Sequence, residues 1–144
     1  MTHNEFITNM KSRGAGASSG VSMREITLAN AALQQRRCAM IPEFLMELYT
    51  ICGSIFLDSG YIFGPIEVSE NRISPIPGIV QINDEIAPMG KTVGKTIFGR
   101  NDLFWFAFDA FGTFYMLDNL TLNTLRKYDD PYKALADCLI AGKI

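Results

Sequence analysis

Between residues 103 and 109, apolar side chains alternate with a period of two, which is typical of a β-strand. One side of this strand carries three phenylalanines and the other carries Trp105, so both faces are expected to be at least partly covered. A turn follows, in which Gly112 is free to take a positive φ, and residues 113–117 then return as a second strand. The pattern predicts a β-hairpin at the centre of a sheet.

Apolar residues recur at helical spacing in the first third of the chain. Ser22 and Glu25 have the spacing of a capping box, which predicts that a helix begins at residue 23. A second helix is expected to begin at Pro42, because proline lacks the N–H that a first helical position leaves unpaired, and to end at Gly53. The two helices are expected to be antiparallel or crossed.

Short elements separated by glycine and proline are expected in the middle of the chain. The candidate strands are residues 54–57, 61–63, 66–68 and 79–82. A third strand after the hairpin is expected within residues 120–128. A closing helix is predicted over residues 131–141, with acidic caps at Asp129 and Asp130. A further short helix is predicted over residues 4–13.

Strands in the middle of the chain, with helices before and after them, predict an α+β fold. We expect a central, mostly antiparallel sheet with two N-terminal helices and a C-terminal helix packed on it. The 144 residues suffice for one domain with a buried core, which we place at residues 21–144. Residues 1–20 are expected to be a flexible segment attached through Phe6 and Ile7 only, because residues 13–20 are small and polar.

Composition and charge narrow the function classes. The formal net charge is −2, and no basic stretch is longer than the pair Arg36–Arg37, so nucleic-acid binding is not expected. No apolar run approaches the roughly 18 residues of a membrane span and no targeting segment is visible, so we expect a cytoplasmic protein without membrane contact. The cysteines form no close pairs and are expected to be buried, reduced thiols on helices; they are Cys38, Cys52 and Cys138.

Candidate catalytic groups are few. The only histidine is His3, which argues against a serine or cysteine triad and against a zinc site. The adjacent acids Asp84 and Glu85 can hold a divalent cation, as can residues 129–130, but a solvated loop face explains the first pair better and a helix cap the second. Residues 90–96 fall one residue short of a phosphate-loop pattern and precede a strand. We therefore expect no catalysis and no cofactor.

Polar residues flank the central strand. Arg100 and Asp102 stand at its entry, where they either contact a partner or, more commonly, pair with each other in a turn. Trp105 faces away from the phenylalanines and belongs either to the core, the more common outcome, or to an interface, where tryptophan is a frequent anchor.

Several of these motifs occur in an order that is shared with a known family. A capped helix is followed by Ile41-Pro42-Glu43-Phe44-Leu45 and a second helix that ends near Cys52-Gly53. Later come Phe98-Gly99-Arg100-Asn101-Asp102, the central hairpin, and Tyr128-Asp129-Asp130 before the last helix. Over about residues 22–142 this order resembles the SUKH superfamily, which unites bacterial immunity proteins with yeast cell-wall-synthesis regulators. Within that group the chain is most similar to the YrhA-like branch.

The resemblance implies a protein-binding module rather than an enzyme, because the family has no shared catalytic motif. Many bacterial members neutralise secreted toxins, often nucleases, by direct contact, so the expected partner is a toxin domain. A mildly acidic inhibitor would complement a basic toxin. The alternatives are a regulatory adaptor without a toxin partner and a hydrolase that uses carboxylates and a metal. The oligomeric state stays open.

Acidic residues on loops beside the sheet are expected to make the contact, because loops tolerate the variation that partner specificity requires. The candidates are Asp58, Asp84, Glu85 and Asp102, with Arg100 and Trp105 as supporting contacts.

Overall fold

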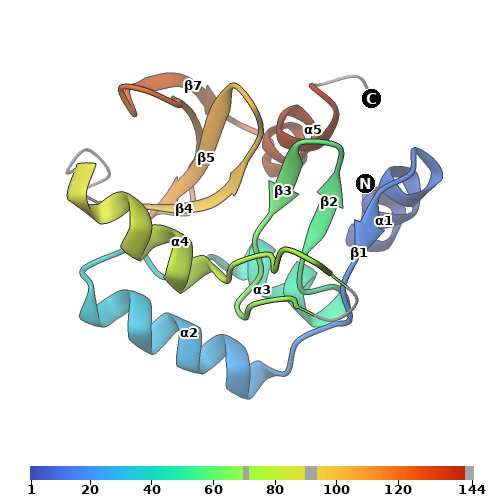
Figure 1. The fold of residues 1–144 in the computed structure, drawn as a ribbon, viewed down its shortest axis with the longest axis horizontal. Coiled ribbons are helices and arrows are strands. Elements are labelled where there is room, and N and C mark those ends of the chain that lie inside the picture. The colour runs from blue at the N-terminus through green and yellow to red at the C-terminus, as the bar shows by residue number, and fades with distance from the viewer. Residues whose placement is uncertain (70–71, 90–93, 142–144) are drawn as a thin grey trace.

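The computed structural model describes residues 1–69, 72–89 and 94–141, which form five α-helices and one seven-stranded sheet (Figure 1). The helices are α1 (His3–Ser12), α2 (Met23–Gln35), α3 (Glu43–Ile51), α4 (Ile79–Ile86) and α5 (Pro131–Ile140). The strands are β1 (Gly16–Ala17), β2 (Ile55–Leu57), β3 (Gly60–Ile62), β4 (Lys95–Arg100), β5 (Phe104–Asp109), β6 (Phe114–Asp118) and β7 (Thr124–Tyr128). The predicted α+β class is confirmed.

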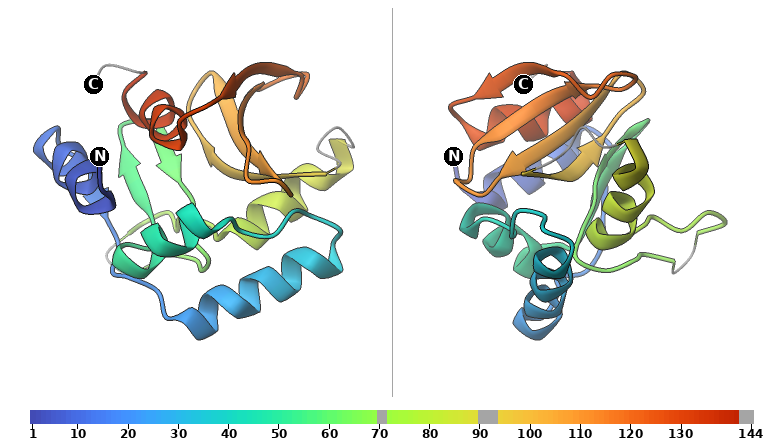
Figure 2. Two further views of the ribbon diagram at one scale, coloured as in Figure 1. Left: turned by 180° about the vertical axis from the view of Figure 1, so that it is seen from behind. Right: turned by 90° about the vertical axis from the view of Figure 1, so that its left-hand side faces the viewer.

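The strands lie in the sheet in the same order as in the chain, and every neighbouring pair is antiparallel. Helices α2 and α3 connect β1 to β2, and α4 lies in the connection from β3 to β4. The sheet is strongly twisted, so that β7 runs across the direction of β2 and β3 (Figures 1 and 2).

The central hairpin is formed as the sequence predicts. Strands β5 and β6 pair in register, with Phe106 opposite Met116. Gly112 has a φ of +76° in the turn between them. The carboxylate of Asp109 accepts hydrogen bonds from two backbone N–H groups of this turn and, at 2.7 Å, from the hydroxyl of Tyr115. These contacts hold the turn closed.

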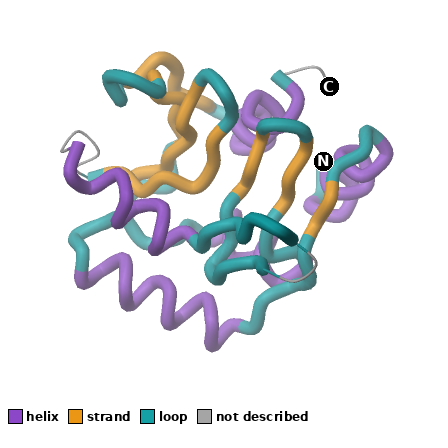
Figure 3. Tube along the Cα trace, viewed as in Figure 1, coloured by secondary structure: helices purple, strands orange, loops and turns teal. Residues whose placement is uncertain are grey.

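The main core lies between one face of the sheet and the helices α1, α2, α3 and α5 (Figure 2). The phenylalanines of β5 point into it, and Phe106 and Phe108 are fully buried. A smaller core lies on the opposite face, where Ile82 and Ile86 of α4 pack against residues of β3 to β6. Only part of this second face is covered, since α4 is its one helix among the described residues (Figure 3).

Helix α4 corrects the prediction of a strand at residues 79–82. Buried residues at positions 79, 82, 83 and 86 have helical spacing, and the side chain of Gln81 accepts a hydrogen bond from Gly78 N at the start of the helix. Asn83 fixes the helix to the sheet: its side chain bonds both the N–H and the C=O of Ile97, each at 2.8 Å. Long-range packing therefore decides an ambiguous apolar run in favour of a helix.

Other differences concern element ends. Residues 66–68 form no strand, only a single bridge between Val68 and Ile76. Ser22 does cap α2, accepting from Glu25 N at 3.2 Å. Pro42 is the residue before α3 rather than its first residue. The segment that resembles a phosphate loop falls largely on residues 90–93, outside the described residues.

The N-terminal segment is more firmly attached than expected. Met10 is buried together with Phe6 and Ile7, and β1 adds a strand to the edge of the sheet beside β2. Backbone bonds continue beyond β1, from Ser18 N to Ser54 O and from Gly53 N to Ser19 O. The expectation that the segment is attached through Phe6 and Ile7 only is wrong, because the backbone of residues 16–19 bonds to the edge of the sheet and Ser18 Oγ accepts from Ser54 N at 2.8 Å.

No helix among the described residues combines the length and the apolar character that crossing a membrane requires.

Replacing Asn83 by alanine is expected to lower the free energy of unfolding by about 2–4 kcal/mol, because two backbone groups of Ile97 lose their buried partner. Urea denaturation measures the change. Asn123→Ala is the matched control, since Asn123 is exposed, and it should cost less than about 0.5 kcal/mol. Equal stability of the two variants would contradict the role given to Asn83.

Hydrogen exchange is expected to distinguish two adjacent serines. The amide of Ser18 donates to Ser54 O at 2.9 Å, whereas Ser19 N has no acceptor among the described residues. Ser18 should therefore exchange about tenfold or more slowly than Ser19. Equally fast exchange at both amides would restore the picture of a loosely attached, flexible segment.

Candidate functional site

A row of side chains crosses the less covered face of the sheet. In the strand registers, Phe56 pairs with Tyr61, Tyr61 with Arg100, and Arg100 with Trp105. Helix α4 packs against other residues of this face, among them Phe63, Ile97 and Ala107. The three aromatic rings of the row are therefore left half-buried at the end of the strands, and Arg100 is exposed.

Cations stack on the aromatic rings of this face. The guanidinium carbon of Arg100 lies 4.8 Å from the ring centre of Trp105, and that of Arg72 lies 4.8 Å from the ring centre of Phe56. Trp105 is therefore half-buried: it is not fully in the core, and Arg100 covers part of its ring. Stacking of this kind contributes roughly 0.5–1 kcal/mol at exposed positions, and it restricts the orientation of each guanidinium.

An open cleft of about 510 Å³, here called the aromatic cleft, lies between β3, β4, α4 and the segment 72–77. The rings of Tyr61 and Phe63 form its apolar floor and are parallel, with an interplanar angle of 2°. Arg72, Arg100, Glu85 and Asp102 bring two positive and two negative groups to its lining.

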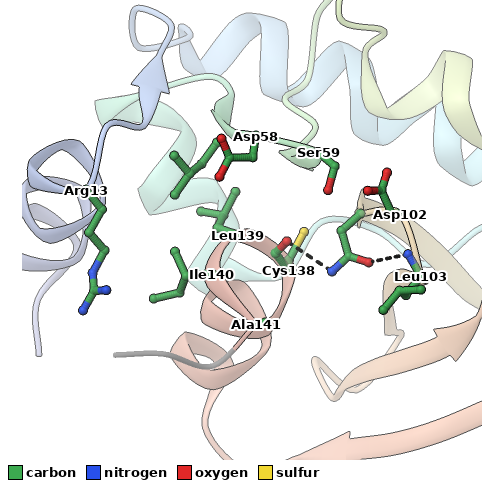
Figure 4. A pocket seen from close by; sticks show the side chains of 11 residues that line it. Arg13, Asp58, Ser59, Asp102, Leu103, Cys138, Leu139, Ile140 and Ala141 are labelled. Carbon is green, nitrogen blue, oxygen red and sulfur yellow. Dashed lines mark hydrogen bonds between the residues drawn. The ribbon is translucent and has the colours of Figure 1, made fainter.

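A second open cleft, of about 580 Å³ and here called the turn cleft, lies where the β2–β3 and β4–β5 turns meet the C-terminal end of α5. Figure 4 shows Leu139 and Ile140 between Arg13 on one side and Asp102 and Leu103 on the other. Leu103 is 64% exposed, which adds apolar area beside the charged groups. The two clefts share Ser59 and Asp102, so they are neighbours.

Asn101 fixes the β4–β5 turn that separates the clefts. Its side-chain oxygen accepts from Leu103 N and Phe104 N, each at 2.9 Å. Its side-chain nitrogen donates to the backbone carbonyls of Asp137 and Cys138, each at 3.3 Å, and Figure 4 shows the bond to Cys138. The turn is thus attached to α5, and Asp102 and Leu103 are presented from a fixed backbone.

The structure brings together five of the six predicted contact residues, four of them in the cleft linings and the fifth, Trp105, next to Arg100. Asp58 and Asp102 line the turn cleft, and Glu85, Arg100 and Asp102 line the aromatic cleft. Trp105 lies beneath Arg100. Asp58 has a φ of +51°, a conformation that aspartate and asparagine tolerate better than most residues. Arg100 and Asp102 do not form an ion pair among the described residues.

Asp84 is separated from the other candidates. Its carboxylate accepts from Arg36 of α2, with Nε to Oδ1 at 2.6 Å and Nη2 to Oδ2 at 3.2 Å. Asp84 therefore ties α4 to the end of α2, whereas Glu85, one position further along the helix, reaches the aromatic cleft.

Several residues of the site are absent from the sequence-based candidates, among them Tyr61, Arg72 and Asn101. Tyr61 belongs to a predicted strand, but its face could not be assigned without its partner strand. Arg72 lies in a segment without periodicity. Asn101 carries the clearest available signal, because asparagine in a turn commonly bonds the backbone two residues ahead.

The residues considered for chemistry have structural contacts instead. His3 is held between α3 and α5, with Nδ1 2.8 Å from the hydroxyl of Tyr132 and its ring edge-on to Phe44. Asp130 caps α5 by accepting from Tyr132 N. Among the described residues, no three or more His, Cys, Asp or Glu side chains come close enough to hold a metal ion.

Two of the three thiols are arranged against reactivity. Burial raises the pKa of Cys52 to about 11 and also raises the pKa of Cys138, although Cys138 lines the turn cleft. The Cys138 thiol is directed to the backbone carbonyls of Tyr61 and Arg100. Cys38 is half-buried, and its pKa is raised by burial as well. Cys38 lies beyond the end of α2 and Cys52 follows the last residue of α3, so of the three only Cys138 lies on a helix as predicted.

No protein-family model matches the chain, and no curated protein is similar to it at a significant level.

Labelling with a thiol reagent such as Ellman's reagent is expected to modify one cysteine in the folded protein at pH 8. Cys38 should react, because it is the half-buried thiol, while Cys52 and Cys138 should react only in denaturant. Mass spectrometry of the labelled peptides identifies the site. Rapid labelling of Cys138 without denaturant would mean that the turn cleft opens to the thiol.

Proposed function

We propose that this chain is a protein-binding module of the SUKH type, which neutralises a toxin domain in the cytoplasm by direct contact. The proposal assigns it no catalysis and no cofactor. A regulatory adaptor would use the same kind of surface with a different partner, so the identity of the partner distinguishes the two.

The observation that carries the proposal is the meeting of two open clefts at rigidly held turns. We call this the loop-end surface; it consists of Asp58, Ser59, Asn101, Asp102 and Leu103, with the linings of both clefts on either side. It combines exposed apolar area, aromatic rings and charges of both signs. Such a mixture is typical of protein interfaces, in which aromatic and arginine side chains are enriched.

Preorganisation supports this choice of surface. Asn101 fixes one turn to α5, and stacking orients Arg72 and Arg100. Side chains that are already ordered lose less conformational entropy when a partner binds.

The acidic residues of this surface suit a basic partner. Asp58 and Asp102 stand on adjacent turns, and both are exposed. Exposed charges at the rim of an interface act mainly on the association rate, through long-range attraction that salt screens.

The double variant Asp58→Asn, Asp102→Asn is expected to slow association with a basic toxin domain about three- to tenfold at low salt. Asparagine keeps the side-chain shape and tolerates the positive φ at position 58. The toxin domain encoded by a neighbouring gene is the partner to use, and surface plasmon resonance at two salt concentrations measures the rate and its salt dependence.

Asp129→Asn is the matched control, because Asp129 is exposed at the opposite end of α5 from the turn cleft. It should leave the association rate within about twofold of the unmodified protein. Equal association rates for the double variant and the control would show that the acidic turns do not contribute to the interface. Failure of the unmodified protein to bind the toxin would overturn the proposed function itself.

A further inference from the structure

Two guanidinium groups line the aromatic cleft without a carboxylate partner among the described residues. Ion pairs there involve Arg36 and Arg126 but neither Arg72 nor Arg100. Arg72 Nε donates to the backbone carbonyl of Ser74 at 3.1 Å, and its terminal nitrogens have no acceptor within the part of the chain that the structure describes. Each guanidinium carbon lies over an aromatic ring, and a ring face does not replace the planar acceptors that the N–H donors of a guanidinium can bind.

The surroundings of these donors favour a ligand with an apolar stem. The floor of the cleft is the parallel pair Tyr61 and Phe63, and Ile76 adds a buried aliphatic wall. A carboxylate at the end of a short methylene chain would meet guanidinium edges at its head and apolar surface along its stem. Guanidinium and carboxylate match in shape, since both are planar and can form two parallel hydrogen bonds.

The charges of the lining favour a ligand with one negative charge over a polyanion. Glu85 and Asp102 line the same cleft as Arg72 and Arg100, so the four charges sum to zero. The cleft therefore has no excess positive charge to balance the several negative charges of a phosphate or another polyanion. A single carboxylate needs only the N–H donors of one guanidinium.

We propose that the aromatic cleft binds one carboxylate group, supplied by an aspartate or glutamate side chain of the protein partner. The inference rests on the proposed function and adds to it the chemistry of one contact. The acids of the loop-end surface then meet basic groups of the partner, while the cleft beside them receives an acidic one. Alternating signs of this kind fix the orientation of two proteins and exclude partners with the wrong pattern.

The chain carries its own reporter for this site, because Trp105 is its single tryptophan and stacks against Arg100. The probe is N-acetyl-glutamate α-amide, which has one carboxylate, titrated at constant ionic strength. We expect a saturable change in tryptophan fluorescence with a Kd on the order of 1–20 mM, as befits a single small group. The neutral N-acetyl-glutamine amide and inorganic phosphate should give no saturable change.

Variants test the arginines and the acid separately. Arg72→Gln should raise the Kd of the probe about fivefold or more while leaving the Arg100–Trp105 reporter in place. Glu85→Gln should lower this Kd about two- to threefold. Arg24→Gln is the matched control on the exposed surface of α2 and should change nothing. Backbone amide NMR shifts of Tyr61 and Arg100 provide a second readout in the same titrations.

The inference is overturned if neither readout shows saturation, if the glutamine amide binds as well as the glutamate amide, or if Arg72→Gln has no effect. These outcomes are independent of the toxin. A protein that binds the toxin domain but not the carboxylate probe refutes the cleft contact alone, whereas a protein that binds the probe but no toxin refutes the proposed function.

Discussion

The side chain of Asn83 makes the contact on which the arrangement of the site depends. Strand β3 pairs with β4 only near Gly99 and Arg100, so the earlier part of β4 has no strand on that side. The carboxamide of Asn83 takes the place of a strand there, since it donates to the C=O of Ile97 and accepts from its N–H. A helix is thereby attached where the sheet would otherwise expose an edge, and the aromatic row beside it is left uncovered.

The aromatic cleft lies where the part of the second sheet face that α4 covers meets the part that it leaves open. Packing of Ile82 and Ile86 covers the positions near Ile97, whereas none of the helices that the structure describes covers Tyr61 and Arg100 toward the end of the strands. Stacking by arginines lowers the exposure of the rings without removing charge from the surface. The site is therefore the part of the second face that α4 is too short to reach.

The sequence patterns correctly predicted those helices and strands whose formation depends on neighbouring residues alone. The hairpin around Gly112 and the helix after Asp130 follow from alternation, turn chemistry and capping. The prediction of a strand at residues 79–82 was wrong because a short apolar run fits both a strand and a helix, and the bonds of Asn83 favour the helix only once β4 is present. The attachment of β1 was missed for a similar reason, since backbone bonds to Ser54 leave no trace in side-chain composition.

The site was predictable only as a set of turn residues. Asp58, Arg100 and Asp102 border strands in the sequence, so their exposure follows from their position. Their convergence with Arg72 does not, because it depends on how the 72–77 segment returns over β3. The separation of Asp84 from Glu85 is a matter of helix rotation, about 100° per residue, which sends neighbours to different surroundings.

The identity of chain order and strand order has a consequence for how the protein is made. As the chain leaves the ribosome, each new strand from β2 onward has its neighbour already synthesised, so the sheet can grow one strand at a time from its N-terminal edge. Helix α1 is the exception. Its contacts with α3 can form early, but His3 meets Tyr132 across 129 positions of sequence, so this contact waits until α5 has been made. The N-terminal helix therefore acquires its full set of neighbours only after all seven strands of the sheet.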